Sequence, residues 1–483
     1  EPYYRQALTL YQTLPGTERD QATCLYSLAT TLSKLNKLAQ AEPYYHQALT
    51  LYQDIPNTEK NQANCLLLLA TTLRELGQLA DAEPYYRQAL TLYQTIPNTE
   101  ENQATCLKNL ANTLDDLGKP AQAEPYYRQA LTLYQTLPGT ERDQATCLYS
   151  LATTLSKLNK LAQAEPYYHQ ALTLYQDIPN TEEEQANCLL NLATTLFVLD
   201  KLAQAESHYR QALTLYQTLP NTQRDQAHCL LNLAATLYNL GRGVETEPLY
   251  RQAIHLCEGT SGTEQIHATC LQRLASVVTS KGDGHLREAL TLYHQALTLY
   301  KTLTDSDADQ AHCLTQQGLI TTHLGHLADA ETYYHQALTL YEHINTPIEH
   351  ATCLQHLANC LAHMHNRTTD TLTTLDNALD ILTHTNTSET APQRLDILLS
   401  LTHTHLINGD HFLAQIHAHA ALDLSHHPTI SHADAHRAHF TYAAALHAQA
   451  HATTNPEHAK NLLTQALNHA LPAALFDDEY RYQ

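Results

Sequence analysis

The fold is decided by EPYYRQALTLYQTLPGTERDQATCLYSLATTLSKLNKLAQA, residues 124–164, because residues 1–41 repeat this stretch letter for letter. Exact or looser copies of its opening begin at Glu1, Glu42, Glu83, Glu124, Glu165, Glu206 and Glu247. Each copy starts 41 residues after the previous one. An internal period of this size predicts a solenoid, in which each repeat packs only against its neighbours.

Each repeat contains two stretches with the apolar periodicity of a helix, residues 20–36 and 38–54 in the first complete repeat. Their apolar stripes are Ala22, Leu25, Leu28, Ala29 and Leu32 in the first stretch, and Ala41, Tyr45, Ala48, Leu49 and Tyr52 in the second. Side chains at these spacings share one face of a helix. We therefore predict an all-α fold, an α-solenoid of stacked antiparallel helix pairs.

Residues that tolerate a left-handed backbone separate the two helices of a repeat. They are Asn36, Gly77, Gly118, Asn159, Asp200 and Gly241. Such residues commonly end a helix, and Thr17 is the expected N-cap of the first helix. Pro43 lies early in the second helix, and we expect this helix to start near Ala39 or Gln40, where a missing N–H costs little.

Composition and charge exclude several classes of protein. The 483 residues are 43% hydrophobic and 16% charged, so the chain is apolar enough to fold. Its net charge of −22, from 27 basic and 49 acidic residues, disfavours nucleic acid and anionic membranes as partners. No apolar run approaches the roughly 18 residues of a membrane-spanning helix, and no signal peptide is recognisable.

Nine of the eleven cysteines recur at one repeat position. They are Cys24, Cys65, Cys106, Cys147, Cys188, Cys229, Cys270, Cys313 and Cys353. Equivalent positions on packed helices lie about 10 Å apart, which exceeds the roughly 7 Å limit between the Cα atoms of a disulfide. We expect buried, reduced thiols and a cytoplasmic location.

Residues 1–256 resemble the tetratricopeptide repeat, in the long-loop form similar to kinesin light chains, whose units also carry an AEP-aromatic box. Leu25, Leu28, Ala29 and Leu32 match the first-helix signature, and Ala41, Tyr45 and Ala48 match the second. Residues 257–345 are divergent repeats, anchored by YHQALTLY at 293–300 and 334–341, and residues 346–483 are degenerate and rich in His. The resemblance implies one continuous right-handed superhelix of about eleven and a half repeats.

The two ends of the chain suggest an excerpt of a longer protein. The sequence starts inside a repeat at Glu1, and a stripe of Leu471, Leu475, Phe476 and Tyr480 continues almost to the last residue. A solenoid normally ends in a repeat with a polar outer face. We therefore expect open ends through which the solenoid could self-associate.

The family resemblance implies that the first helices line a concave, ligand-binding groove. Residues 42–82 and 165–205 are sister repeats that differ at eight positions. Three of these lie on the first helix outside its core stripe: Leu68 against Asn191, Arg74 against Phe197, and Glu75 against Val198. The predicted groove residues are Tyr26, Ser27, Thr30, Leu67, Leu68, Thr71, Arg74, Lys108, Asn109, Asn112, Tyr149, Leu190, Asn191, Phe197, Leu231, Asn232 and Tyr238, together with Ser33, Lys34 and Asp115. Apolar and aromatic groups interleaved with Asn suit a peptide or helix anchor. The alternative for each residue is half-burial against a neighbouring helix.

A carboxylate clamp of Lys and Asn, known in some family members, is matched only by Lys108 and Asn112. The following repeats offer Tyr149, Thr153, Leu190 and Thr194 where further basic residues would be required. The clamp is therefore not carried over to this chain.

Histidine is concentrated in the second half of the chain, with 30 of 32 beyond residue 200. His432, His436 and His439 fall at i, i+4 and i+7 beside Asp434, which makes them a weak candidate metal site. So many histidines also produce such patterns by chance. Full protonation would change the charge from −22 to −22 + 32 = +10, so acidification could reshape the array.

No catalytic motif is present: the sequence has no Gly-rich phosphate loop, no Gly-x-Ser-x-Gly and no His-Glu-x-x-His. We expect a scaffold that is not an enzyme, needs no cofactor or metal, and binds a peptide or partner protein in its groove. One alternative is the sensor arm of a larger bacterial signalling enzyme, a nucleotide-switch ATPase or caspase-like peptidase, as the family association implies. Another is an architectural spacer that self-assembles.

Overall fold

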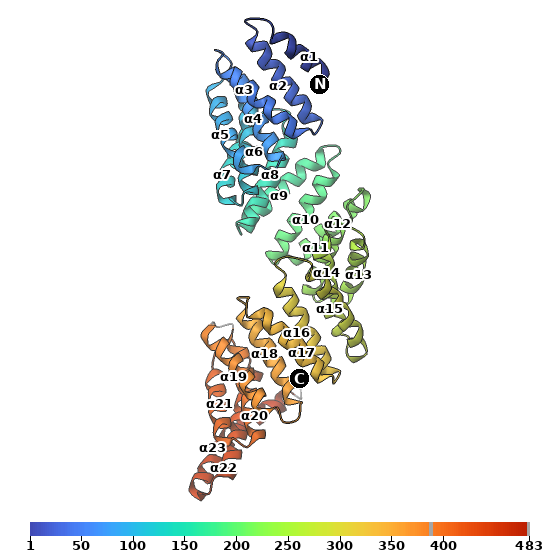
Figure 1. The fold of residues 1–483 in the computed structure, drawn as a ribbon. Helices are drawn as coiled ribbons and strands as arrows, with labels where there is room; N and C mark the ends of the chain where they lie inside the picture. Colours follow the sequence, from blue (N-terminus) through green and yellow to red (C-terminus); the bar gives the residue numbers. More distant parts are fainter. Residues whose placement is uncertain (386–389, 481–483) are drawn as a thin grey trace. The chain divides into compact units, whose positions relative to one another are not determined.

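The computed structural model describes residues 1–385 and 390–480, with side chains described through residue 470 (Figure 1). These residues form 23 α-helices in consecutive antiparallel pairs, two short 3₁₀ helices and no β-strand. The predicted all-α solenoid is therefore confirmed, and one unpaired helix followed by eleven pairs matches the expected number of repeats. The apolar end residues Leu471, Leu475, Phe476 and Tyr480 lie outside the described side chains.

The chain divides into two compact units, the N-terminal unit (1–249) and the C-terminal unit (250–483). The first twelve helices are α1 (Pro2–Tyr11), α2 (Glu18–Lys34), α3 (Leu38–Gln53), α4 (Glu59–Glu75), α5 (Leu79–Thr95), α6 (Glu100–Asp116), α7 (Pro120–Tyr134), α8 (Glu141–Lys157), α9 (Leu161–Asp177), α10 (Glu182–Val198), α11 (Leu202–Thr218) and α12 (Gln223–Asn239). They are followed by the 3₁₀ helix η1 (Gly243–Glu245) and by α13 (Thr246–Cys257).

The C-terminal unit continues the same alternation of first and second helices. Its helices are α14 (Glu264–Thr279), η2 (Asp283–His285), α15 (Leu286–Tyr300), α16 (Asp307–His323), α17 (Leu327–Tyr341), α18 (Pro347–Ala362), α19 (Thr368–Thr385), α20 (Ala391–Asn408), α21 (His411–Leu424), α22 (His432–Ala452) and α23 (Pro456–Tyr480). Among the helices described, none is both long and apolar enough to cross a bilayer.

The two predicted apolar stripes form the core between the helices of each pair. All ten of their residues in the first complete repeat are buried, so this prediction is confirmed. The largest buried side chains are tyrosines of the second helices, such as Tyr45 and Tyr52, each 1% exposed. Burial on this scale is the main favourable contribution to folding.

A pair of hydrogen bonds, which we call the tyrosine clamp, joins the two helices of a repeat. In α3, the Tyr45 hydroxyl donates to Thr30 Oγ1 at 3.2 Å, and the Tyr52 hydroxyl donates to Thr23 Oγ1 at 3.2 Å. In the next repeat the acceptors are Thr71 Oγ1 at 3.1 Å and Asn64 Oδ1 at 2.6 Å. These bonds satisfy hydroxyls that would otherwise lose hydration on burial.

A polar contact, which we call the latch, joins consecutive repeats along the second helices. Glu83 pairs with Arg87 of its own helix at 2.9 Å and with Lys119, just before α7, at 3.3 Å. Arg87 also donates to the Tyr126 hydroxyl at 2.7 Å. Further latches join Glu124 to Lys160 at 2.8 Å, Glu165 to Lys201 at 2.7 Å, and Glu206 to Arg242 at 2.8 Å. Exposed ion pairs of this kind contribute about 0.2–1 kcal/mol each.

The predicted left-handed residues do end the first helices. Asn36 has φ 57°, Gly77 has φ 78° and Asp200 has φ 59°. The N–H of Lys37 then reaches back to the Leu32 carbonyl oxygen at 2.9 Å. This arrangement satisfies carbonyl groups that the end of a helix leaves free.

Two local predictions were wrong in detail. Helix α3 begins at Leu38, so Pro43 is its sixth residue, beyond the first turn. Its missing N–H leaves the Ala39 carbonyl without its helical donor, but both residues are exposed, so water can solvate that oxygen. Thr17 occupies the N-cap position of α2 without a side-chain cap bond. Its hydroxyl instead donates to carbonyl oxygens of the preceding turn, including that of Tyr11 at 2.6 Å.

Candidate protein-binding surface

The first helices of the N-terminal unit form a row from α2 through α4, α6, α8 and α10 to α12. Consecutive helices in this row contact one another directly, whereas consecutive second helices approach less closely and are joined mainly by the long side chains of the latch. In a curved stack, the row whose members lie closer together is on the inner side. The predicted groove residues belong to this row.

Most predicted groove residues are half-buried, which leaves part of each side chain accessible. The half-buried members of the predicted set are Tyr26, Ser27, Thr30, Ser33, Leu68, Thr71, Arg74, Lys108, Asn109, Asn112, Asp115, Tyr149, Asn191, Phe197, Leu231 and Asn232. Two members are core residues instead, because Leu67 is 8% and Leu190 is 7% exposed. Tyr238 is the most accessible, at 64%.

Two tyrosines of the row, Tyr26 and Tyr149, pack edge-on against the core. Tyr26 lies 6.1 Å from the ring of Tyr45, and Tyr149 lies 6.0 Å from that of Tyr168. Burial raises the pKa of Tyr26 to about 12. The Asn191 amide donates to the Tyr149 hydroxyl at 2.6 Å, so these two predicted residues are brought together across neighbouring repeats.

Several polar members of the predicted set already have structural partners. Thr30, Thr71 and Asn112 accept the hydroxyl protons of the tyrosine clamp, the last from Tyr127 at 2.6 Å. Lys108 pairs with Asp143 at 2.5 Å and lies 5.5 Å from the centre of the Tyr134 ring. Lys108 therefore links neighbouring repeats and Asn112 links the two helices of one repeat, which agrees with leaving out the carboxylate clamp.

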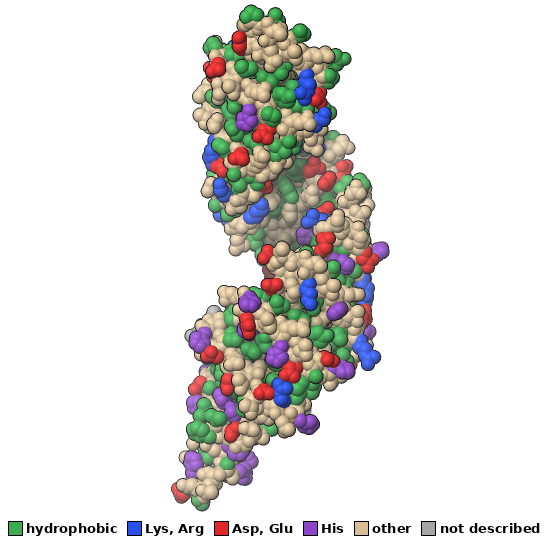
Figure 2. Space-filling model, in the orientation of Figure 1, with side chains coloured by type: hydrophobic (Ala, Val, Ile, Leu, Met, Phe, Trp, Pro, Cys, Tyr) green, Lys and Arg blue, Asp and Glu red, His purple; other side chains and the backbone are tan. Residues whose placement is uncertain are grey.

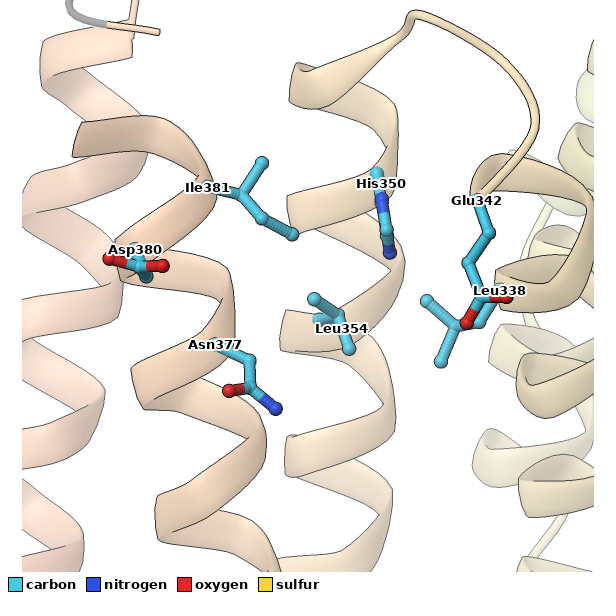
Figure 3. A pocket seen from close by; sticks show the side chains of 7 residues that line it. All are labelled: Leu338, Glu342, His350, Leu354, Asn377, Asp380 and Ile381. Atoms are coloured by element: carbon cyan, nitrogen blue, oxygen red, sulfur yellow. The ribbon is translucent and has the colours of Figure 1, made fainter. Parts of the chain in front are cut away.

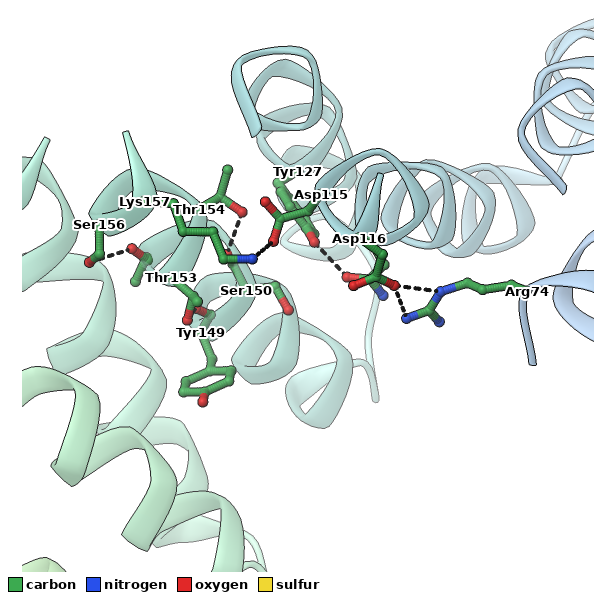
Figure 4. A network of polar contacts seen from close by, with 12 residues as sticks. Arg74, Asp115, Asp116, Tyr127, Tyr149, Ser150, Thr153, Thr154, Ser156 and Lys157 are labelled. Atoms are coloured by element: carbon green, nitrogen blue, oxygen red, sulfur yellow. Dashed lines mark hydrogen bonds and ion pairs between the residues drawn. The ribbon is translucent and has the colours of Figure 1, made fainter. Parts of the chain in front are cut away.

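Opposite charges link the C-terminal ends of α4, α6 and α8 (Figure 4). Arg74 pairs with Asp116 at 3.0 Å, and Lys157 pairs with Asp115 at 2.6 Å. We call these two pairs the charge ladder. Each joins one repeat to the next, so Arg74, predicted to face a ligand, contributes to the stacking of repeats. The sequence does contain a signal for these pairs, because the two partners of each pair are 42 residues apart, which is one repeat plus one residue.

An apolar patch follows the charge ladder along the row. It consists of Phe197, Val198, Tyr238 and Val244, of which Val198 is 60%, Tyr238 is 64% and Val244 is 94% exposed. Outside α1, the other large hydrophobic residues that the N-terminal unit exposes are Leu14, at 53%, and Leu35, at 54%. Comparison of the sister repeats had marked Phe197 and Val198, whereas Val244 follows the last complete repeat and was missed.

The candidate metal site is not formed. The residues that the structure describes contain no group of three or more His, Cys, Asp or Glu side chains placed to hold a metal ion. His439 faces His469 of α23 instead, with the two Nδ1 atoms 3.1 Å apart. Figure 2 shows that histidines are frequent on the C-terminal unit, while Lys and Arg are scattered without forming a basic patch.

A cleft of about 310 Å³ in the C-terminal unit was not predicted (Figure 3). It lies between the second helices α17 and α19, with α18 as its floor, and its lining residues are Leu338, Glu342, His350, Leu354, Asn377, Asp380 and Ile381. His350 lies against the Tyr341 ring, with ring centres 6.1 Å apart, and burial lowers the pKa of His350. Its lining combines three apolar side chains with two carboxylates, one imidazole and one amide.

The cysteines are all free and buried, as predicted. Burial raises the pKa of Cys65 to about 12, and it also raises the pKa values of Cys257 and Cys360, which fall outside the periodic set. A nucleophilic cysteine needs its thiolate form near neutral pH. The buried environments of these cysteines instead favour the protonated thiol.

Antiparallel helix pairs that recur at a constant period, each packed on the next, define a helical repeat protein of the solenoid class. The chain belongs to the tetratricopeptide repeat family. Two descriptions of the Tetratricopeptide repeat match it, one at residues 1–54, 35–95, 62–136, 102–177 and 143–218, and the other at residues 226–267. The resemblance drawn from the sequence is therefore confirmed.

Several solved structures are similar in part. BtubC (BKLC) from P. vanneervenii is 23% identical, with 47% of this chain and 92% of that chain covered and a TM-score of 0.41. YrrB, described as a TPR protein with an unusual peptide-binding site, is 18% identical over 45% and 93%, with a TM-score of 0.34. Aspartyl phosphate phosphatase F from Bacillus subtilis is 11% identical over 78% and 97%, with a TM-score of 0.44. No curated protein sequence matches the chain.

Proposed function

We propose that the row of first helices in the N-terminal unit binds a segment of another protein. The observation that carries this proposal is the contrast between sister repeats. The core residues of the two sister repeats are the same, whereas two residues of the row, Arg74 and Glu75 in one repeat, are Phe197 and Val198 in the other. Because Val198 is 60% exposed, the change has no evident benefit for packing within the chain.

The chemistry of the row suits a protein partner. Aromatic and aliphatic groups beside Asn side chains are typical of the anchors at protein interfaces. Its cations Arg74, Lys108 and Lys157 are neutralised by aspartates of neighbouring repeats, which argues against a polyanion. We infer that the chain acts by binding and not by catalysis, and the raised thiol pKa values support this inference.

A pull-down from a cell extract tests the proposal with the whole chain. Leu68, Phe197, Leu231 and Tyr238 are half-buried or exposed, so changing them to Asp alters the surface more than the core. Leu67 and Leu190 are unsuitable, because an Asp at a buried position would test folding. The matched control changes exposed second-helix residues Gln88, Gln129 and Gln170 to Asp.

We expect the row variant to lose partners that the control variant retains, with the same helical content by circular dichroism. Equal recovery of partners by both variants would remove the row as the binding surface. A variant that loses helical content is replaced by single substitutions at Tyr238 and Leu231, of which Tyr238 is 64% exposed.

A further inference from the structure

Helix α16 has a glutamine where the other repeats have a core leucine. Gln317 stands four residues after Cys313, and it is fully buried, with 0% of its surface exposed. Four residues after each of the other periodic cysteines stands a buried leucine: Leu28, Leu69, Leu110, Leu151, Leu192, Leu233, Leu274 and Leu357. Among the residues that the structure describes, neither the Nε2 nor the Oε1 atom of Gln317 has a hydrogen-bond partner. Helix α16 therefore buries an unpaired amide at a position that is otherwise apolar.

The buried amide makes the closed state of α16 less stable than that of its sister helices. Water hydrogen-bonds to both amide atoms when the helix is open, and burial removes these bonds without replacing them. Leu110, at the equivalent place in α6, loses no such bonds on burial. Helix α16 packs against α17 as the other first helices pack against their partners, so the weakness comes from the amide and not from a gap.

Gly318, the next residue, favours opening of the same helical turn. It stands where the other repeats have alanine, such as Ala111 in α6. A Cβ atom at Gly318 would lie 2.7 Å from Cε1 of the buried Tyr334 ring, so alanine does not fit there. Glycine gains more backbone freedom than alanine when a helix opens. This gain adds to the effect of the unpaired amide.

The thiols of the N-terminal repeats are hydrogen-bonded to the preceding second helix, whereas the thiol of α16 is not. The Cys106 thiol donates to the Tyr86 carbonyl oxygen at 3.1 Å, and the equivalent bonds of the N-terminal unit are 3.0–3.3 Å long. Tyr293 holds the equivalent position in α15, but within the described residues Cys313 makes no such bond to it. One contact between α16 and the helix before it is therefore absent.

The tyrosine clamp is also longer in this repeat. In a regular repeat, the Tyr86 hydroxyl donates to Thr71 Oγ1 at 3.1 Å. Leu319 takes the place of Thr71, and the Tyr334 hydroxyl lies 3.4 Å from Thr322 Oγ1 instead. A hydrogen bond of this length is weak. Helix α16 is therefore held less firmly to α17 as well as to α15.

We propose that the solenoid has a built-in opening point at α16, where this helix separates from α15 and α17 while the regular repeats stay closed. Because each repeat of a solenoid packs only against its neighbours, one repeat can open without unfolding the array. Opening hydrates the Gln317 amide and exposes the side chain of Cys313. This inference does not depend on the proposed binding function.

The periodic cysteines report on the opening of each repeat within one molecule. Cys313, Cys106 and Cys147 are all fully buried, and burial raises the pKa of each thiol to about 12. A maleimide therefore reaches such a thiol only when its repeat opens. The whole chain is treated briefly with N-ethylmaleimide under native conditions, and peptide mass spectrometry gives the labelling rate at each cysteine. We expect Cys313 to be labelled about tenfold or more faster than Cys106 and Cys147.

Substitutions at Gln317 test whether the amide is the cause. Gln317→Leu restores the residue of the other repeats, and it should slow the labelling of Cys313 to about the rate of Cys106. Gln317→Met keeps the length of the side chain without the amide, in case leucine does not fit beside Gly318. The matched control is Gln316→Leu, at a half-buried position where a regular repeat has Leu68, and it should leave the rate unchanged.

Amide hydrogen exchange of α16 and α6 provides a second readout that does not involve the thiols. We expect faster exchange in α16, and slower exchange there in both Gln317 variants. Equal labelling of Cys313 and Cys106 in the unmodified chain would overturn the proposal. So would fast labelling that neither Gln317 variant reduces, because the opening would then have another cause. A fall in rate as large in Gln316→Leu as in Gln317→Leu would likewise refute the role of the buried amide.

Discussion

Individual tyrosines of the second helices join the two helices of a repeat through both apolar burial and a hydrogen bond. Tyr93 is fully buried, and its hydroxyl donates to the Oδ1 atom of the half-buried Asn64 on the first helix of the same repeat. The ring contributes apolar burial and the hydroxyl contributes a directed bond, so one side chain fixes both the distance and the register of two helices. Burial of the ring explains the raised pKa of Tyr93.

Removing this hydroxyl should have a measurable cost. Tyr93→Phe leaves the Asn64 side chain without the donor that it holds at 2.6 Å, so we expect the free energy of unfolding to fall by about 1 kcal/mol. The control is Tyr126→Phe, whose hydroxyl accepts from Arg87 at a half-buried surface position, where water can replace it. Urea denaturation followed by circular dichroism compares them, and equal losses would contradict the role given to burial.

The left-handed turns after the first helices give a second prediction at this scale. Gly77 has φ 78°, a conformation that costs a residue with a Cβ roughly 1–2 kcal/mol. We expect Gly77→Ala to lower the melting temperature. Gly284→Ala is the control, because Gly284 has open space around its Cβ position and no left-handed backbone. A similar fall in both variants would show that the turn geometry is not the cause.

At the scale of helices, repeated spacing predicted more than local propensity did. The stripes of α2 and α3 are buried as expected, because a period of 41 residues places every copy in the same environment. The start of α3 was predicted too late in the sequence, because helix propensity argues against a proline in the interior of a helix. The structure tolerates Pro43 there because the Ala39 carbonyl that lacks a donor is exposed to water. The latch was missed because its partners lie 36 residues apart in the sequence.

One junction of the N-terminal unit lacks the latch. Glu42 has Gln78 at the position where Glu83 has Lys119, and its ion-pair contact is with His46 Nε2 at 4.0 Å, which carries a charge only when it is protonated. We expect Gln78→Lys to raise the free energy of unfolding by about 0.2–1 kcal/mol, an effect that salt should diminish. Gln78→Met, of similar length without charge, should have no such salt-dependent gain. A gain that persists in about 1 M NaCl would contradict the ion pair as its source.

Over the whole molecule, the two units differ in the chemistry of their surfaces. The N-terminal unit carries nearly identical repeats tied by Arg, Lys and Glu, whereas 28 of the 32 histidines belong to the C-terminal unit. Several of these histidines contact each other between helices. His417 of α21 stacks on His405 of α20 with ring centres 5.2 Å apart, and His439 of α22 meets His469 of α23.

These contacts predict that the C-terminal unit loses stability in mild acid. Burial, and then the neighbouring His405, lower the pKa of His417, although Asp376 of α19 acts in the opposite direction. Burial also lowers the pKa of His439, followed by His469, His426 and His436. Because both folded pKa values lie below those of the unfolded chain, unfolding takes up protons as the pH falls through about 6.5. Stability is therefore complete above that pH and declines below it.

The measurement is the melting temperature between pH 7.5 and 5.5. We expect a fall for the unmodified chain and a smaller fall for the double variant His417→Gln, His439→Gln. His255→Gln is a control, because His255 is exposed beside Glu258 and has no histidine partner among the contacts described. An unchanged melting temperature across this range would dispose of the pH effect.

How much of the candidate surface the sequence predicted depends on the residue. Phe197 and Val198 stood out because the sister repeat holds Arg74 and Glu75 at the same positions, whereas Tyr238 was included only as a residue of the predicted groove. Arg74 and Lys108 were expected to face a ligand, but each is drawn to an aspartate of the next repeat. Which charges are already paired depends on how the helices of neighbouring repeats are aligned in space. A single sequence does not give that alignment directly.

The absence of a latch at Glu42 has a mechanical consequence. If a molecule were stretched between its two ends, load would pass through every junction in series, and each would resist according to its own contacts. Glu83, Glu124 and Glu165 each have a cross-junction lysine, while Glu42 faces an uncharged glutamine. In a force–extension experiment on the regular part of the array, the earliest rupture should therefore come where that glutamine sits.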